Sequence, residues 1–214
     1  GDVRAWISIP EGKKKYPGVI VIHENRGLTP HIRDVNNRMA QEGFVALAPD
    51  ALSPLGGTPE DQDKARDMFS QLDRQQTVNN FVAAVKYLET HPRTTGKVGC
   101  TGFCWGGAMT NQVAVNSPDL DAAVPYYGST PASEDVPKIR AKMMAHYASD
   151  DERINSGIPA FEEALKQAGI EYQIFIYEGT QHAFNNDTGP RYNKEAAGLA
   201  WERTTTFFRE KLGS

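Results

Sequence analysis

The sequence predicts an α/β fold, a doubly wound and mostly parallel sheet with helices on both faces. Apolar, β-branched runs alternate along the chain with amphipathic segments of helical period. The runs at residues 18–23 and 44–48 are apolar throughout, which is typical of parallel strands buried on both faces. A length of 214 residues suits one large α/β domain over residues 1–214, and we find no linker, repeat or low-complexity segment.

The same patterns place the individual elements. Strands are expected at residues 4–10, 18–23, 44–48, 97–100, 122–127, 142–147 and 171–177. Helices are expected at residues 30–42, 61–72, 77–91, 108–116, 158–168 and 195–211. Pro30 begins the first helix and Gly43 ends it, while the strand at residues 4–10 is expected at an edge of the sheet.

Composition excludes several classes of partner. The net charge is −4, from 23 basic and 27 acidic residues, and without a basic run we expect no nucleic-acid partner. No apolar stretch is long enough to span a membrane. The two cysteines, Cys100 and Cys104, flank one tight turn, so cysteine usage does not indicate an oxidising compartment. We expect a cytoplasmic protein, with export by a signal removed ahead of residue 1 as the alternative.

A candidate nucleophile lies in the pattern G-F-C-W-G-G at residues 102–107, between an expected strand and an expected helix. G-x-C-x-G in that setting is the cysteine form of the nucleophile elbow. The turn strains the backbone of Cys104, so the residues two before and two after must be nearly without side chain, as Gly102 and Gly106 are. Backbone N–H groups at the helix N-terminus would favour a thiolate there. The alternative is a glycine-rich turn with a buried, inert cysteine.

Partners for this nucleophile are expected beyond the carboxyl ends of the strands, where open α/β sheets bind ligands. The polar residues that follow strands are Glu24, Asp50, Cys104, Asp150, Asp151 and His182. Cysteine, aspartate and histidine in this chain order match the triads of α/β-hydrolases. Cys104 would attack a carbonyl and His182 would take its proton, with Asp150 or Asp151 orienting the imidazole. The other aspartate would be solvated or would cap the next helix.

The negative charge that develops in such a reaction needs backbone donors. We expect the N–H of Trp105 to be one donor and the N–H of Asn25, in the loop after the second strand, to be the other. Glu24 is either a site residue or an ordinary loop carboxylate.

No cofactor or metal is expected from the motifs. The remaining histidines, at positions 23, 31, 91 and 146, are expected to be structural or surface residues. His23-Glu24 is not a zinc motif because Gly27 stands where H-E-x-x-H needs histidine, and no phosphate-binding glycine motif is present.

These residues resemble the dienelactone hydrolase family. The resemblance covers most of the chain, through V-I-V-I-H-E-N-R-G-L at 19–28, G-F-V-A-L-A-P-D at 43–50, G-F-C-W-G-G at 102–107 and G-T-Q-H-A-F at 179–184. It implies an α/β-hydrolase that cleaves an ester or lactone through a thioester on Cys104 and needs no cofactor. The family pattern G-x-x-D-x-x-[IV] falls on residues 148–154 and implies Asp151 as the acid. It also implies that Glu24 holds the resting thiol and moves aside when substrate binds.

The chain departs from the family pattern at several positions. Ala148 replaces a glycine, Asn155 stands where proline is common, and Asn25 stands where dienelactone enzymes carry an apolar residue. Asn186 occupies the position of an arginine that grips the substrate carboxylate in those enzymes, and Arg191 lies nearby in the sequence. The substrate among small esters and lactones therefore stays open. Two rival functions are a thiol redox protein, with Cys100 as the resolving cysteine, and a binding protein without catalysis.

Overall fold

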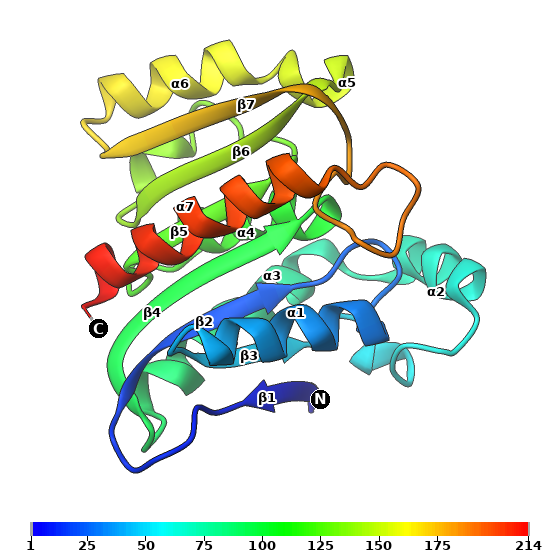
Figure 1. The fold of residues 1–214 in the computed structure, drawn as a ribbon, viewed down its shortest axis with the longest axis vertical. Coiled ribbons are helices and arrows are strands. Elements are labelled where there is room, and N and C mark those ends of the chain that lie inside the picture. Colours follow the sequence, from blue (N-terminus) through cyan, green and yellow to red (C-terminus); the bar gives the residue numbers. More distant parts are fainter. Residues whose placement is uncertain (1, 214) are drawn as a thin grey trace.

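A seven-stranded sheet organises the computed structural model, which describes residues 2–213 (Figure 1). The strands are β1 (Ala5–Ser8), β2 (Tyr16–Ile22), β3 (Val45–Pro49), β4 (Thr94–Phe103), β5 (Ala122–Tyr126), β6 (Lys142–Asp150) and β7 (Tyr172–Gln181). Their order across the sheet is β1-β3-β2-β4-β5-β6-β7. Only β1, at the edge, pairs antiparallel to its neighbour, which confirms the predicted mostly parallel α/β class.

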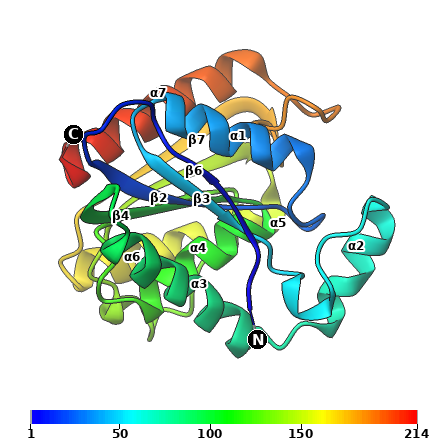
Figure 2. The same cartoon turned by 90° about the horizontal axis from the view of Figure 1, so that it is seen from below.

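Helices cover both faces of the sheet. They are α1 (Pro30–Gln41), α2 (Gln62–Met68), α3 (Arg74–Thr90), α4 (Trp105–Asn116), α5 (Glu152–Asn155), α6 (Ile158–Gln167) and α7 (Lys194–Leu212). Helices α1 and α7 lie on one face, and α3, α4 and α6 lie on the other (Figure 2). The sheet is therefore buried between two helical layers, as the uniformly apolar strands require.

Each face of the sheet has its own hydrophobic core. In β2, Val19 and Val21 pack toward α1 and α7, whereas Ile20 and Ile22 pack toward α3 and α4. All four side chains are fully buried. Successive residues of a strand point to opposite faces, so an unbroken apolar run supplies both cores at once.

Several elements have other bounds than the sequence predicts, and one was not predicted. Strand β4 begins at Thr94 rather than at residue 97 and is ten residues long. Helix α3 begins at Arg74 because the Asp73 carboxylate accepts the backbone N–H of Gln76 at 2.7 Å and caps the helix. The short helix α5 was not predicted at all, since four residues are too few for a periodic pattern.

The carboxyl ends of the parallel strands share one edge of the sheet. The loops after β2 and β7, blue and orange in Figure 1, lie there together with α2. Strands β6 and β7 run farther toward this edge than predicted and end at Asp150 and Gln181, next to two candidate site residues. Across residues 2–213, none of the helices combines the length and apolarity needed to cross a membrane.

Candidate active site

Cys104 lies at a sharp turn between β4 and α4. Its φ of 58° and ψ of −116° place a non-glycine residue in a region that L-amino acids rarely adopt. A Cβ at Gly102 would come within 2.2 Å of the Gly106 carbonyl oxygen, and a Cβ at Gly106 would come within 2.4 Å of the Ile22 and His23 carbonyls. Both glycines are therefore required by close backbone contacts around the cysteine.

In the structure, the His182 side chain lies between those of Cys104 and Asp151 and contacts both. The Nε2 atom of His182 lies 3.0 Å from the Cys104 sulfur, and its Nδ1 lies 2.6 Å from Asp151 Oδ2. His182 follows β7 directly, and Asp151 is the residue between β6 and α5. An ionised carboxylate can only accept a hydrogen bond, so Nδ1 carries the proton in the neutral ring and Nε2 faces the sulfur as an acceptor.

The two adjacent aspartates have different surroundings. The Asp151 side chain is only 7% exposed and contacts the imidazole, whereas Asp150 is exposed at the end of β6. Tyr127 packs against the imidazole, with the two ring centroids 5.0 Å apart. These contacts fix the orientation of His182 and favour Asp151 as its partner.

Glu24 lies in the loop after β2 and is largely buried. Its carboxylate accepts a hydrogen bond of 2.9 Å from the side-chain amide of Asn186. Burial is the main cause that raises its pKa from 4.5 to about 6. The pKa of Cys104 is also raised, first by burial and then by the negative charge of Glu24, while the backbone N–H of Trp105 lowers it. The helix N-terminus alone predicted a thiolate, and burial together with Glu24 outweighs it.

The two expected oxyanion donors occupy different settings. Trp105 is the first residue of α4, directly after Cys104, and its backbone N–H lowers the pKa of the Cys104 thiol. Asn25 is exposed in a turn closed by a hydrogen bond of 3.4 Å from the Gly27 N–H to the Glu24 carbonyl. Trp105 therefore borders Cys104 from α4, and Asn25 belongs to the loop after β2.

A cavity of about 460 Å³ opens beside this arrangement. Its wall is formed by the loops after β2 and β7, the start of α1 and one residue of α2. The polar side chains that line it are Glu24, Asn25, Arg26, Thr29, His31, Gln62, Asn186, Thr188 and Arg191. Arg191 thus faces the same cavity as Asn186, although it does not occupy the family's arginine position.

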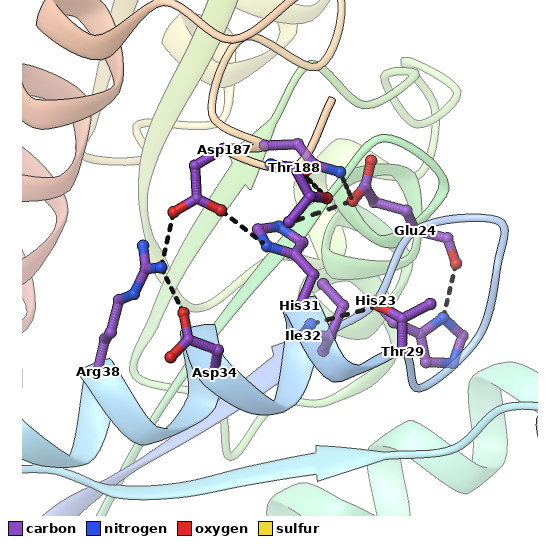
Figure 3. Close-up of polar contacts among 10 residues, drawn as sticks. His23, Glu24, Thr29, His31, Ile32, Asp34, Arg38, Asp187 and Thr188 are labelled. Atoms are coloured by element: carbon purple, nitrogen blue, oxygen red, sulfur yellow. Dashed lines mark hydrogen bonds and ion pairs between the residues drawn. The ribbon is translucent and has the colours of Figure 1, made fainter. Parts of the chain in front are cut away.

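Polar contacts, including an ion pair between Arg38 and Asp187, join α1 to the loop after β7 (Figure 3). His31, whose side chain is 9% exposed, lies 4.0 Å from Glu24 Oε1 through Nε2 and 3.3 Å from Asp187 Oδ1 through Nδ1. Arg38 donates to Asp187 at 2.7 Å and also pairs with Asp34. Burial is the main cause that lowers the pKa of His31.

Sequence reasoning missed the roles of these residues. Asn186 carried a signal, because it stands at a position the family resemblance singles out. Asp187 and His31 carried none, since the contact between Asp187 and Arg38 joins residues 149 positions apart. Asp50 has no contact with the Cys104, His182 and Asp151 side chains; it binds the Leu52 and Thr58 backbone N–H groups and supports the neighbouring loop.

Metal binding has no candidate in the part of the chain described. Within residues 2–213, no group of three or more His, Cys, Asp or Glu side chains could hold a metal ion.

A mostly parallel sheet with a strained cysteine between a strand and a helix defines the chain as an α/β-hydrolase. Residues 3–212 match the model of the dienelactone hydrolase family. A "Putative carboxymethylenebutenolidase" from Saccharolobus solfataricus is 31% identical over 245 residues, covering 97% of this chain and 93% of the relative. "Protein usf" from Aquifex pyrophilus is 36% identical over 221 residues, covering 98% and 94%.

A solved structure agrees with these sequence relatives. The "Putative Dienelactone Hydrolase" from Klebsiella pneumoniae superposes with a TM-score of 0.88 at 27% identity, over 97% of this chain and 93% of that one. The chain belongs to the dienelactone hydrolase family. It is a hydrolase of ester or lactone bonds, which confirms the class of enzyme predicted from the motifs.

Proposed function

We propose that this hydrolase cleaves a small carboxylic ester or lactone through a thioester on Cys104. The observation that carries the proposal is the arrangement in which His182 Nε2 lies 3.0 Å from the sulfur and Nδ1 lies 2.6 Å from Asp151. This geometry suits a nucleophile, a base and a residue that orients the base.

In the first half of the reaction, the Cys104 thiol gives its proton to His182 Nε2 while the sulfur attacks the carbonyl carbon. The π electrons of the carbonyl move onto its oxygen, where the backbone N–H groups of Trp105 and Asn25 stabilise the charge. When this intermediate collapses, the bond to the leaving oxygen breaks. That oxygen takes the proton from His182, which leaves a thioester on Cys104.

In the second half, a water molecule gives a proton to His182 Nε2 and attacks the thioester carbonyl. The carbon–sulfur bond then breaks, and the sulfur regains a proton from His182 as the acid product forms. Asp151 stabilises the imidazolium in both halves and does not itself take the proton.

Glu24 keeps the free enzyme in its thiol form. Burial and the neighbouring carboxylate both favour the neutral sulfur. A substrate that displaces Glu24 from the site removes one of these two effects and makes the thiolate more accessible. The resting enzyme is thereby protected from oxidation, which requires the thiolate.

The cavity favours substrates that carry a negative charge. Arg26 and Arg191 line it, and the positive charges of Arg153 and Arg191 lower the pKa of Cys104. A carboxylate on the substrate would meet guanidinium groups, which recognise carboxylates well. We therefore expect anionic esters and lactones to be turned over with a lower KM than neutral ones.

The redox alternative has less support than hydrolysis. Cys100 is fully buried, and burial raises its pKa to about 12. A resolving cysteine must reach the oxidised partner as a thiolate, which this surrounding disfavours. The alternative of a binding protein without catalysis predicts the same cavity but no turnover.

Trapping the intermediate tests the proposal. Acid quenching during turnover of an activated ester should give an acyl adduct on the peptide that carries Cys104. The Cys104→Ala variant should be folded and inactive, and iodoacetamide should label Cys104 and spare Cys100. An adduct elsewhere, or activity in the variant, would contradict the proposal. Peroxide turnover without ester turnover would favour the redox function, and a folded protein that turns over neither would favour binding alone.

A further inference from the structure

His23 is a fully buried histidine that joins three parts of the site. Its Nδ1 lies 2.7 Å from the backbone carbonyl oxygen of Glu24, a contact drawn in Figure 3. Its Nε2 accepts the backbone N–H of Ala51, in the loop after β3, at 3.0 Å. The ring also lies against Trp105, with the two planes 8° apart and the centroids at 5.5 Å.

These contacts determine the tautomer of His23. A backbone N–H can only donate, so Nε2 must accept from Ala51 and cannot carry a proton. The proton of the neutral ring is therefore on Nδ1, from which it is donated to the Glu24 carbonyl. Burial lowers the pKa of His23, and Asp50 is the charged neighbour that opposes this. The ring remains neutral. Its Nδ1 donates to the Glu24 carbonyl, and its Nε2 accepts from the Ala51 N–H.

The His23 ring contacts the segments that carry both expected oxyanion donors, the backbone N–H groups of Asn25 and Trp105. Its hydrogen bond to Glu24 holds the peptide that ends at the Asn25 nitrogen, and its stacked face rests on Trp105. The backbone around it is equally confined, because the carbonyls of Ile22 and His23 pack within 2.4 Å of a Cβ built at Gly106. Phe69 packs edge to face against both rings, with its centroid 4.8 Å from that of Trp105 and 5.9 Å from that of His23.

We propose that His23 is a positioning residue for hydrolysis, which holds the Asn25 and Trp105 backbone N–H groups at the spacing that an oxyanion needs. This inference rests on the proposed function of Cys104. A donor contributes to catalysis only when it lies close to the position that the oxyanion will occupy, so a small displacement of the loop is costly. Sequence reasoning assigned His23 a structural or surface role, and no charge or motif distinguished it.

Two amide variants separate the two hydrogen bonds. His23→Asn places an amide nitrogen near the position of Nδ1 and can still donate to the Glu24 carbonyl. His23→Gln reaches the position of Nε2 with its oxygen and can still accept from Ala51, but it loses the donor to Glu24. Both variants lose the stacked ring. We expect kcat of His23→Gln to fall about 10²-fold and that of His23→Asn about tenfold, with little change of KM.

Controls separate positioning from general destabilisation. His146→Gln removes another fully buried histidine, which is bound to Tyr177 and Thr204. It should lower the melting temperature as His23→Gln does but leave kcat within a few-fold of wild type.

The outcomes distinguish this inference from the proposed function. If Cys104→Ala is inactive but the two His23 variants have equal kcat, or their losses follow stability alone, the inference is wrong and the proposed function stands. If Cys104→Ala is active, the proposed function itself is wrong. For variants that do not fold, ¹⁵N-histidine NMR of the wild-type protein provides the test. A proton on Nδ1 of His23 supports the inference, and a proton on Nε2 overturns it.

Discussion

At the scale of single residues, the tandem aspartates offer a direct comparison. Asp151 accepts a hydrogen bond from the imidazole of His182, whereas the Asp150 side chain faces solvent. Asp151→Asn should reduce kcat by about 10⁴-fold, because an amide that donates to Nδ1 favours the wrong tautomer. Asp150→Asn should change kcat by less than about tenfold. Steady-state kinetics on one activated ester checks both variants, and the reverse ranking would assign the acid to Asp150.

Glu24 allows a prediction of pH dependence. Its pKa of about 6 means that the carboxylate is ionised at neutral pH, where its charge raises the pKa of Cys104. In Glu24→Gln this charge is absent, so the thiol should ionise at lower pH. Rates of iodoacetamide labelling measured against pH should therefore show a midpoint displaced to lower pH in the variant. Below the pKa of Glu24 the wild-type carboxylate is protonated, and the rates of the two proteins should converge. Superimposable profiles would show that Glu24 does not influence the thiol.

The residues that could be foreseen are those whose chemistry leaves a local pattern. Cys104 is enclosed by glycines that its backbone demands, and His182 and Asp151 directly follow strands. His23 contacts Ala51 and Trp105, and Asp187 contacts His31 and Arg38, all of which lie far away in the sequence. Such contacts impose no spacing on the neighbouring sequence, which is why they became visible only in three dimensions.

At the scale of elements, helix α1 and the loop after β7 are joined by the ion pairs of Asp187. This residue contacts both His31 and Arg38, while the next residue back, Asn186, binds Glu24. Two successive residues therefore hold the loop in place. Asp187 binds helix α1, and Asn186 binds Glu24 in the candidate site.

Asp187→Asn should loosen this loop. We expect kcat/KM to fall about tenfold, because the loop carries Asn186 and lines the cavity. Hydrogen exchange of residues 183–193 should become faster. Asp34→Asn is the matched control, since it removes the other carboxylate on Arg38 and leaves Asp187 in place. Equal effects of the two substitutions, or none from the first, would indicate ordinary surface pairs of small energetic value.

The strands were predictable because burial on both faces leaves an apolar run in the sequence. The ends of the strands were harder to predict. Strands β4, β6 and β7 all extend beyond the apolar residues into polar ones, because backbone pairing continues where side-chain burial stops. The path of residues 183–193 could not be predicted, because it depends on ion pairs with α1 rather than on local propensity.

At the scale of the whole molecule, stability depends on two cores separated by the sheet. Phe208 of α7 is fully buried, packs against Phe44 and lies directly over Gly99 of β4, whose Cβ position is 2.7 Å from its ring. Phe208→Ala should lower the free energy of unfolding by about 3–5 kcal/mol. Denaturant titration measures this loss. Activity below the melting temperature should be retained, because the site lies at the carboxyl ends of the strands, whereas Phe208 packs on a face of the sheet. A loss under about 1 kcal/mol would mean that the core refills the space.

The backbone of Cys104 has a consequence for how this enzyme can change over time. Its dihedral angles are ones that glycine adopts freely and that any other residue adopts only at a cost of about 1–3 kcal/mol. Folding alone would thus favour glycine over cysteine at this position. If Cys104 acts as proposed above, a lineage released from the need to hydrolyse its substrate would gain stability by replacing this residue with glycine, and retention of the cysteine in a descendant would be a sign that selection for catalysis persists.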